Sequence, residues 1–390
     1  MKIVILSMFS VPTGHTKVAE VLRNSLSQEY PNAEIKIIDF LTFSSSLLEK
    51  MVSNIYYKWI RESPESYKSF YQKVMMKESD QSVFLKSISR FSPYFENKVL
   101  TLVKNEKPSL LMCTHSFPSR IIGKIKSQSN NLTCKTVNVY TDFFVNDVWE
   151  KEQIDYHLVS TEQVKQKLVT EHRISPDRVY YTGIPVSEVF KRKNPSLPLQ
   201  RKGRKHVLVA GGNSGLCMGK NVFRDFSESK HLQFSVLCGH NHRLYRSLLE
   251  KPNITPYMYI EDLERLNDIY DSVDCIITKP GGVTISEVLH KQIPVFIFAY
   301  LPGQEEFNLT YLLERNLVFH FDEKEPFSSL EEILYDPNEV QRKVEGVERY
   351  LSSLQYGLPE VWKKIQVNTR QKFNMNPVDQ KPSSEIFLSG

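Results

Sequence analysis

Short apolar runs alternate with segments of helical spacing along most of the 390-residue chain. In the segment 15–26, for example, Val18, Val21, Leu22 and Leu26 fall on one side of a helix. Such alternation predicts parallel strands in one sheet with helices packed on it, as in Rossmann-type domains. The strands predicted in the first half are residues 2–8, 34–40, 109–115, 136–142, 156–161 and 178–185.

The alternation stops at a polar linker rich in Lys, Arg and Pro and then begins again. The runs predicted to carry strands after this linker are 206–215, 233–239, 255–260, 274–282 and 294–300. Two such halves indicate an α/β enzyme with two Rossmann-like lobes and a cleft between them. The predicted units are an N-terminal lobe at 1–190, a C-terminal lobe at 206–340, helices at 341–367 that pack back across the lobes, and a disordered tail at 368–390.

The segment 40–102 departs from the alternation, because Phe, Tyr and Leu are interleaved there with Lys and Arg. Residues 40–130 carry 14 basic and 7 acidic side chains, whereas the whole chain has a formal net charge of only +5. A basic and aromatic amphipathic helix suits the surface of an anionic membrane. The alternative is a core-facing helix whose basic face is solvated. The apolar side chains at helical spacing are Leu48, Val52, Ile55, Tyr56 and Trp59.

Composition favours a globular protein of the cytoplasm. Hydrophobic residues make up 41% of the chain and charged residues 24%. No apolar run approaches the roughly 20 residues of a membrane span, and no signal-peptide pattern is present. The five cysteines lack CxxC spacing and lie in or beside apolar runs, which indicates reduced thiols. No nucleic-acid recognition motif accompanies the basic residues.

The segment 275–296 carries the strongest chemical signal, a strand followed by a Lys-Pro-Gly-Gly turn and a helix. Gly281 and Gly282 allow positive φ and a close approach of a ligand to the backbone. The start of a helix suits a phosphate, and Thr284 lies near that start. Glu287, slightly further on, could accept hydrogen bonds from two ribose hydroxyls. The segment therefore predicts a nucleotide site, although an ordinary turn with Glu287 facing the helix dipole is the alternative.

Two further glycine turns follow the first strand of each half. His15 comes directly after Gly14 in the first turn, and residues 211–215 form the second. The first turn lacks a full GxGxxG pattern, which disfavours a dinucleotide such as NAD. A histidine in a turn is usually structural, but the mouth of an interlobe cleft favours a catalytic role for His15. The chain has no DxD motif and no ligand-spaced cluster, so we expect no metal.

Taken together, these motifs resemble the diacylglycerol glycosyltransferases, which comprise bacterial diacylglycerol glucosyltransferases and plant monogalactosyldiacylglycerol synthases. They belong to glycosyltransferase family 28, with the lipid II N-acetylglucosaminyltransferase. The resemblance covers about residues 1–365, and KPGGVTISE with PGQEEFN is its most specific pair. The matching strings are GHTKVAE, THSFPS, YTDFFVNDVW, YHLVSTEQVKQKL, TGIPV, AGGNSG, CGHN, ITKPGGVTISE and PGQEEFN.

The resemblance implies a GT-B fold and a role for each matching residue. His15 would be the general base, and Asp142 is the second catalytic candidate. The diphosphate would be held by Gly212, Ser214, Gly281, Gly282, Val283 and Thr284, and the ribose by Glu287. The hexose would be held by Gln304 and Glu305, with Asn308 supporting that loop, and the 257–263 stretch would line the uracil. Residues placed toward the acceptor or the membrane are Trp149, Trp59, Lys58 and Arg61.

The implied activity is an inverting transfer of a hexose, glucose being the first choice, from a UDP-sugar to a membrane lipid such as diacylglycerol. No cofactor or metal is implied, and the enzyme would bind the cytoplasmic face of an anionic membrane as a peripheral protein. One departure is Asn146, where relatives commonly have a histidine that could move a proton. Two alternatives stay open, a UDP-sugar epimerase of the same fold and a non-catalytic UDP-sugar-binding protein.

Overall fold

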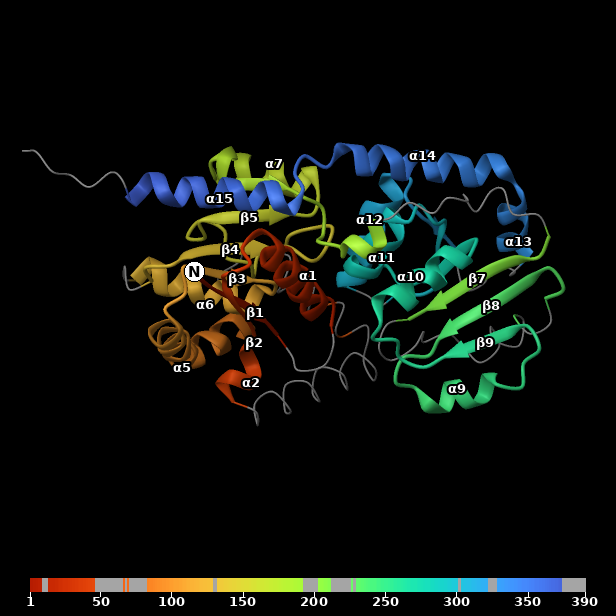
Figure 1. Cartoon of the computed structure of the whole chain (residues 1–390), viewed down its shortest axis with the longest axis horizontal. Helices are drawn as coiled ribbons and strands as arrows, with labels where there is room; N and C mark the ends of the chain where they lie inside the picture. The colour runs from red at the N-terminus through yellow and green to blue at the C-terminus, as the bar shows by residue number, and fades with distance from the viewer. Residues whose placement is uncertain are drawn as a thin grey trace, which may run out of the picture.

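The structure is a computed structural model that describes residues 1–8, 13–45, 66, 69, 83–128, 132–191, 203–211, 226, 229–300, 303–321 and 328–373. Two lobes lie side by side, each built on a parallel sheet (Figure 1). Both sheets have six strands within the described part of the chain. This arrangement confirms the predicted α/β fold class with two Rossmann-like halves.

The first lobe holds the sheet of order β2-β1-β3-β4-β5-β6. Every neighbouring pair in it runs parallel. Its strands are β1 (Lys2–Ser7), β2 (Glu34–Asp39), β3 (Leu110–Cys113), β4 (Lys135–Val139), β5 (Tyr156–Val159) and β6 (Val179–Tyr181). Its described helices are α1 (Gly14–Glu29), α2 (Phe40–Ser44), α5 (Val83–Glu106), α6 (Ser116–Gln128), α7 (Glu162–Thr170) and the short 3-10 helices η2 (Pro176–Arg178) and η3 (Glu188–Lys191).

The second lobe holds the sheet of order β12-β11-β10-β7-β8-β9, which is also parallel throughout. Its strands are β7 (Lys205–Ala210), β8 (Leu232–Leu237), β9 (Ile254–Tyr257), β10 (Cys275–Thr278), β11 (Val295–Ile297) and β12 (Phe319–His320). Its described helices are α9 (His242–Leu248), α10 (Leu263–Ser272), α11 (Gly282–His290), α12 (Gln304–Glu314), α13 (Ser328–Tyr335) and α14 (Pro337–Ser353). The helix that follows, α15 (Leu358–Phe373), packs on the first lobe.

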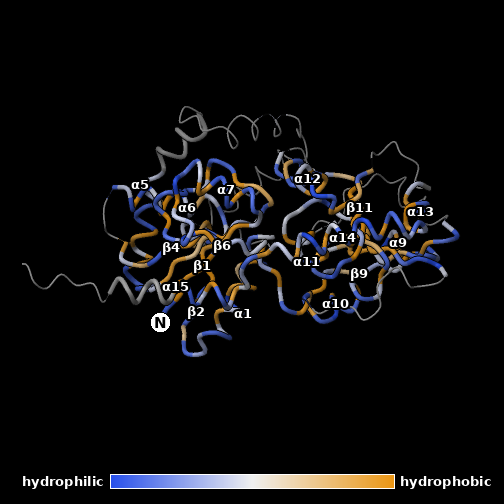
Figure 2. Tube along the Cα trace, turned by 90° about the horizontal axis from the view of Figure 1, so that it is seen from above, coloured by the Kyte–Doolittle hydropathy of each residue, from blue (hydrophilic) through white to orange (hydrophobic). Residues whose placement is uncertain are grey.

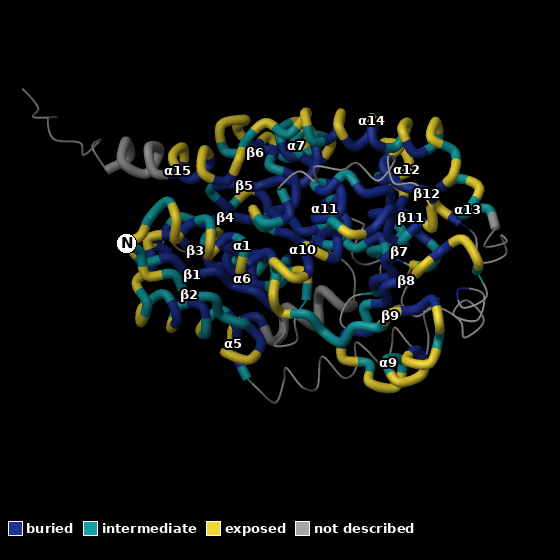
Figure 3. The backbone as a smooth tube through the Cα atoms, turned by 45° about the vertical axis from the view of Figure 1, so that its right-hand side comes forward, coloured by how far each residue is buried: buried dark blue, intermediate teal, exposed yellow. Residues whose placement is uncertain are grey.

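The central strands are largely apolar because helices cover both faces of each sheet. All four residues of β3 and of β10 are buried. Hydrophobic segments run through the middle of each lobe in Figure 2, and Figure 3 shows the buried strands inside the exposed turns of the outer helices. Helix α1 follows the predicted pattern, with Val18, Leu22 and Leu26 buried, whereas Val21 is only half-buried.

The two lobes share a hydrophobic core rather than meeting at a wet surface. Phe143 of the first lobe stacks on Tyr311 of α12 with ring centroids 5.4 Å apart. Phe144 lies 5.3 Å from Phe307 on the same helix. Apolar contacts of this kind favour a closed arrangement because opening would expose aromatic surface.

The last two helices run along the same side of the molecule but belong to different lobes. Helix α14 packs on α11 and α13 of the second lobe, and α15 packs on α1 of the first (Figure 1). On α15 the buried Trp362 donates its indole N–H to the hydroxyl of Ser25 at 2.9 Å. The hydroxyl of Tyr30 donates to the carbonyl of Trp362, also at 2.9 Å. The chain therefore returns to the first lobe at its end.

Several sequence expectations change at their boundaries. Helix α15 continues to Phe373, so residues 368–373 are helical and not part of a disordered tail. The helices expected at 341–367 are α14 and α15, which residues 354–357 separate, and α14 already begins at Pro337. Strand β12 was not predicted, since a two-residue strand leaves no pattern. All the apolar, basic and aromatic side chains expected at a membrane between Leu48 and Lys77 lie outside the described residues. Only Ser66 and Ser69 of that segment are described.

The cysteines that the structure describes confirm the expectation of reduced thiols. Cys113, Cys134, Cys238 and Cys275 are buried and free. Burial raises the pKa of the Cys134 and Cys238 thiols to about 11. These thiols therefore stay protonated and unreactive at neutral pH. Cys217 lies outside the described residues.

Candidate functional site

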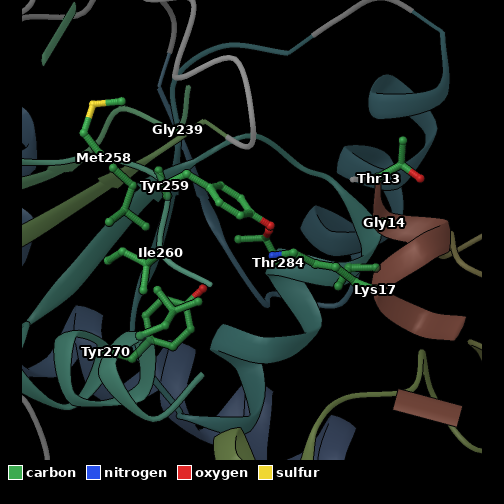
Figure 4. A pocket seen from close by; sticks show the side chains of 13 residues that line it. Thr13, Gly14, Lys17, Gly239, Met258, Tyr259, Ile260, Tyr270 and Thr284 are labelled. Carbon is green, nitrogen blue, oxygen red and sulfur yellow. The ribbon is translucent and has the colours of Figure 1, made fainter. Parts of the chain in front are cut away.

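A cavity of about 230 Å³ lies between the two lobes. The start of α1 supplies one wall with Thr13, Gly14 and Lys17 (Figure 4). The second lobe supplies the other walls from the ends of β7 and β8, the loop after β9, and the starts of α10 and α11. The residues from that lobe are Ala210, Leu237, Gly239, Met258, Tyr259, Ile260, Leu266, Tyr270, Val283 and Thr284. The carboxyl ends of parallel strands thus face the cleft, where ligands of such folds bind.

A second cavity of about 450 Å³ adjoins the first and shares Lys17, Tyr259, Ile260 and Leu266 with it. It is lined by the exposed side of α1, by residues 259–263 and by Glu287 of α11. The ring of Tyr259 stacks on His240 with centroids 4.6 Å apart. The two adjoining cavities together can hold an elongated ligand, and α11 lines the first with Val283 and Thr284 and the second with Glu287.

The start of α11 is packed closely against the first lobe. A Cβ atom at Gly282 would come within 2.0 Å of the Thr141 carbonyl oxygen, so only glycine fits there. Gly281 is the N-cap residue, with φ −80°, and a Cβ atom there would meet nothing within 4 Å. Neither glycine adopts the positive φ that glycine allows. At Gly282, the close approach that needs glycine is made by the Thr141 backbone.

Glu287 is the acidic residue of this site and lies one turn into α11, with 5% of its surface exposed. The hydroxyl of Tyr270 donates to its carboxylate at 3.2 Å. Burial raises the pKa of Glu287, although the charge of Lys17 and the Tyr270 hydrogen bond oppose this shift. A buried carboxylate with only one hydroxyl partner given by the structure keeps acceptor capacity for a ligand.

His15, on the first turn of α1, is held by two oxygen atoms. Its Nδ1 lies 2.8 Å from the carbonyl oxygen of Thr114 and 3.0 Å from the hydroxyl of Thr141. Because a carbonyl can only accept, the contact with Thr114 places the proton on Nδ1 and leaves the lone pair on Nε2. Burial lowers the pKa of His15, outweighing the carboxylate of Asp142 and the Thr114 carbonyl, which raise it. The ring is therefore a neutral base at pH 7.

A second histidine stands beside this base, and the sequence analysis did not assign it a role. The rings of His15 and His115 meet edge to face, with centroids 4.7 Å apart. The backbone N–H of Phe117 donates to Nδ1 of His115 at 3.0 Å, which places the His115 proton on Nε2. Burial, and then the charge that His15 would carry, hold the pKa of His115 well below its ordinary value. The only sequence signal was its place in the THSFPS string.

Asp142 forms a hydrogen-bond network that crosses from one lobe to the other. The amide of Gln304 donates to both carboxylate oxygens, at 2.9 and 2.8 Å. The amide of Asn308 donates to one of these oxygens at 3.0 Å and accepts from the backbone N–H of Phe143 at 2.9 Å. Asn308 is buried, whereas the neighbouring Glu305 is half-buried. Gln304, expected to hold the hexose, and Asn308, expected to support its loop, thus both hold the carboxylate of Asp142 in this structure.

Trp149 does not face a membrane. Its side chain is 7% exposed and packs on Tyr140 in the core of the first lobe, with ring centroids 4.8 Å apart. The resemblance placed Trp149 toward the acceptor or the membrane, whereas its side chain fills the core of the first lobe. Asn146, the departure from the family pattern, is buried and accepts from the backbone N–H of Val148 at 3.2 Å.

The remaining predicted site residues cannot be placed against this geometry. The residues outside the described part of the chain are Gly212, Ser214, Trp59, Lys58 and Arg61. Among the residues that the structure does describe, no group of three or more His, Cys, Asp or Glu side chains is arranged to hold a metal ion. None of the described helices combines the length and the apolar character that crossing a bilayer requires.

Comparisons with known sequences agree with the motifs. The family model of monogalactosyldiacylglycerol synthase matches residues 15–186. The uncharacterised glycosyltransferase YkoN of Bacillus subtilis is 36% identical over 320 residues, which cover 81% of this chain and 83% of YkoN. The processive diacylglycerol β-glucosyltransferase of Bacillus cereus strain B4264 is 29% identical over 333 residues, covering 83% of both chains.

Comparisons with solved structures concern the fold. MurG from Acinetobacter baumannii aligns with a TM-score of 0.58 at 12% identity, covering 96% of this chain and 100% of MurG. The glycosyltransferase SnogD from Streptomyces nogalater gives a TM-score of 0.56 at 14% identity, with 95% and 99% covered. A UDP-N-acetylglucosamine 2-epimerase gives 0.55 at 12% identity, with 98% and 99% covered. The shared two-lobed architecture is the GT-B fold.

The family model covers the part of the first lobe that carries His15 and Asp142, and the identity to YkoN extends over four fifths of both chains. The GT-B fold accounts for the rest of the architecture. The chain therefore belongs to the diacylglycerol glycosyltransferase and monogalactosyldiacylglycerol synthase family, and it is a glycosyltransferase.

Proposed function

We propose that this enzyme transfers a hexose, glucose being the first candidate, from a UDP-sugar to diacylglycerol or a closely related membrane lipid, with inversion at the anomeric carbon. The observation that carries this proposal is the neutral His15, which directly follows Gly14 in the wall of the interlobe cavity. Its Nδ1 is committed to Thr114, so Nε2 is available to accept a proton. Relatives of this chain include an enzyme named as a diacylglycerol β-glucosyltransferase.

The proposed reaction is a single displacement. His15 takes the proton of the lipid hydroxyl as its oxygen attacks the anomeric carbon, and the bond from that carbon to the UDP oxygen breaks. One attack from the face opposite the leaving group inverts the configuration. Asp142 is a poor candidate for a nucleophile that would give retention, because Gln304 and Asn308 already donate to its carboxylate.

The leaving diphosphate needs positive charge or hydrogen-bond donors as its own charge develops. The start of α11 lines the interlobe cavity with Thr284 and can offer free backbone N–H groups. Glu287, further along the same helix, would accept from the ribose hydroxyls. In this proposal the amides of α11 do the work that a divalent cation does in other transferases. Turnover should then persist in EDTA, and a requirement for added Mg²⁺ or Mn²⁺ would contradict it.

The activity can be tested with labelled UDP-hexoses and vesicles that contain diacylglycerol. A labelled glycolipid is expected, with UDP-glucose as the better donor. The fold is shared with a UDP-N-acetylglucosamine 2-epimerase, so an altered free nucleotide sugar would instead indicate epimerisation. Binding without any turnover would indicate a UDP-sugar-binding protein. His15→Ala should lower turnover by about 10²- to 10⁴-fold, the usual range for loss of a general base.

We also propose that the enzyme binds the cytoplasmic face of the membrane as a peripheral protein. The support is the acceptor named for its relatives and the basic, aromatic composition of residues 40–102, most of which lie outside the described residues. Each basic residue near an anionic surface contributes about 1 kcal/mol. Sedimentation with anionic vesicles should therefore exceed that with neutral vesicles and should fall with salt. Equal binding to both kinds of vesicle would reject this proposal.

A further inference from the structure

Lys17 is the one side chain of α1 that lines both interlobe cavities. It lies one turn after Gly14, so it leaves α1 on the side that faces the second lobe. Figure 4 shows the side chain extending from α1 toward Thr284 and Tyr259 of the second lobe. An ammonium group of the first lobe is therefore aimed at the start of α11.

The surroundings of this ammonium group are electrostatically unusual. The start of α11 carries the positive end of a helix dipole, which repels a cation. Glu287 is close enough for the charge of Lys17 to lower its pKa, but the structure gives no salt bridge between them. No salt bridge of Lys17 occurs anywhere among the described residues. The positive charge is thus left facing the cavity.

We propose that Lys17 is a donor-binding residue supplied by the first lobe, whose ammonium group pairs with the diphosphate of the nucleotide sugar. This inference rests on the proposed function and adds to it a residue outside the second lobe. An anion between Lys17 and the start of α11 would satisfy both positive groups at once. It would also join the two lobes through the ligand, because one phosphate contact comes from each.

The role predicts a difference between ligands with and without phosphates. Calorimetric titrations with UDP and with uridine would be made on the wild type, Lys17→Ala, Lys17→Arg and the control Lys104→Ala on α5. Lys17→Ala should weaken UDP binding about 10- to 100-fold, the range for a lost charged hydrogen bond, and leave uridine binding unchanged. Lys17→Arg should recover most of the UDP affinity, and the loss in Lys17→Ala should shrink with added salt.

The outcomes separate this inference from the function on which it rests. If the wild type binds UDP and Lys17→Ala binds it equally well, the inference is wrong and the proposed function stands. If Lys17→Ala loses UDP and uridine by the same factor, Lys17 acts on the nucleoside through Glu287 or on the fold, and the diphosphate contact is rejected. If the wild type binds neither UDP nor UDP-hexoses, the proposed function fails and the inference fails with it. Thermal unfolding of each variant identifies any that is misfolded.

Discussion

The surroundings of the ionisable residues in the cleft set their protonation states. His15 is neutral at pH 7 because burial disfavours its charged form, while the contact with Thr114 selects the tautomer with a lone pair on Nε2. Glu287 is buried in the same cleft, where burial raises the pKa of its carboxyl. Burial in this cleft thus favours the neutral form of both groups, the imidazole of His15 and the carboxyl of Glu287.

The lowered pKa of His15 predicts the pH dependence of turnover. A base must be neutral to act, so kcat/KM should stay level as the pH falls to 6.5 and should decline only below it. Asp142→Asn removes the carboxylate that raises the His15 pKa, so the decline should move to still lower pH. The exposed Asp177→Asn serves as the control. A decline that stays in place, or that moves to higher pH, would contradict the assignment of His15.

The raised pKa of Glu287 makes a prediction about stability. The folded state binds a proton at Glu287 more tightly than the unfolded chain, so this group stabilises the fold at low pH and loses that contribution as the pH rises through its raised pKa. At neutral pH, Glu287→Gln should therefore raise the Tm by about 2 °C, while weakening UDP binding. Thermal scans with and without UDP measure both effects, with the exposed Glu348→Gln as the control. A lower Tm for Glu287→Gln would show that the carboxylate stabilises the free protein.

At the scale of single elements, helix α11 has two adjacent glycines with different roles. Gly282 touches the Thr141 backbone of the other lobe, whereas Gly281 faces open space at the N-cap position. Gly282 therefore allows the close contact between the lobes, and Gly281 forms the turn before the helix. A helix start that must approach a backbone this closely can carry no side chain.

This difference can be tested by the same substitution at both positions. Gly282→Ser should lower the Tm markedly, because its Cβ would lie 2.0 Å from the Thr141 carbonyl oxygen and backbone atoms would have to shift. Gly281→Ser should leave the Tm unchanged or slightly higher, because space is open and serine is a favoured N-cap residue. Thermal unfolding of the free proteins compares them without relying on activity. Equal Tm values for the two variants would mean that α11 does not press on the first lobe.

The elements differ in how far the sequence alone predicts them. Strands such as β3 and β10 are fully buried, so each reads as an unbroken apolar run. The two-residue strand β12 has no such signal. The burial of Trp149 depends on contacts with residues distant in the sequence, which a local pattern does not contain. The pairing of Gln304 with Asp142 joins positions 162 residues apart, which motifs within one segment cannot reveal. The nucleotide-site motif itself was readable because its strand, turn and helix are consecutive.

At the scale of the whole molecule, the amide of Asn308 is one of the groups that hold the lobes together at the cleft. Asn308 of α12 donates to Asp142 and accepts from the N–H of Phe143, so it satisfies two groups of the first lobe. Because Asn308 is buried, removing its amide would leave both groups short of a partner. The closed arrangement thus depends on polar contacts as well as on the aromatic stack of Phe143.

Asn308→Ala should therefore favour an open arrangement of the lobes. The loss of two buried hydrogen bonds costs about 1–3 kcal/mol, which is enough to shift the balance between closed and open forms. Small-angle X-ray scattering should show a larger radius of gyration for Asn308→Ala than for the wild type, and the exposed Asn338→Ala should match the wild type. An unchanged radius would assign closure to the aromatic contacts instead.

The return of the chain to its first lobe has a consequence for synthesis. The first lobe is built from two separate pieces, because α1 packs on α15 and Trp362 fills a place beside Ser25 and Tyr30. The second lobe, in contrast, is contiguous. During synthesis most of the first lobe is made before the second lobe and α15 only after it, so the second lobe can fold before the first is complete. A fragment of residues 1–190 would therefore leave the side of α1 that α15 covers exposed to solvent.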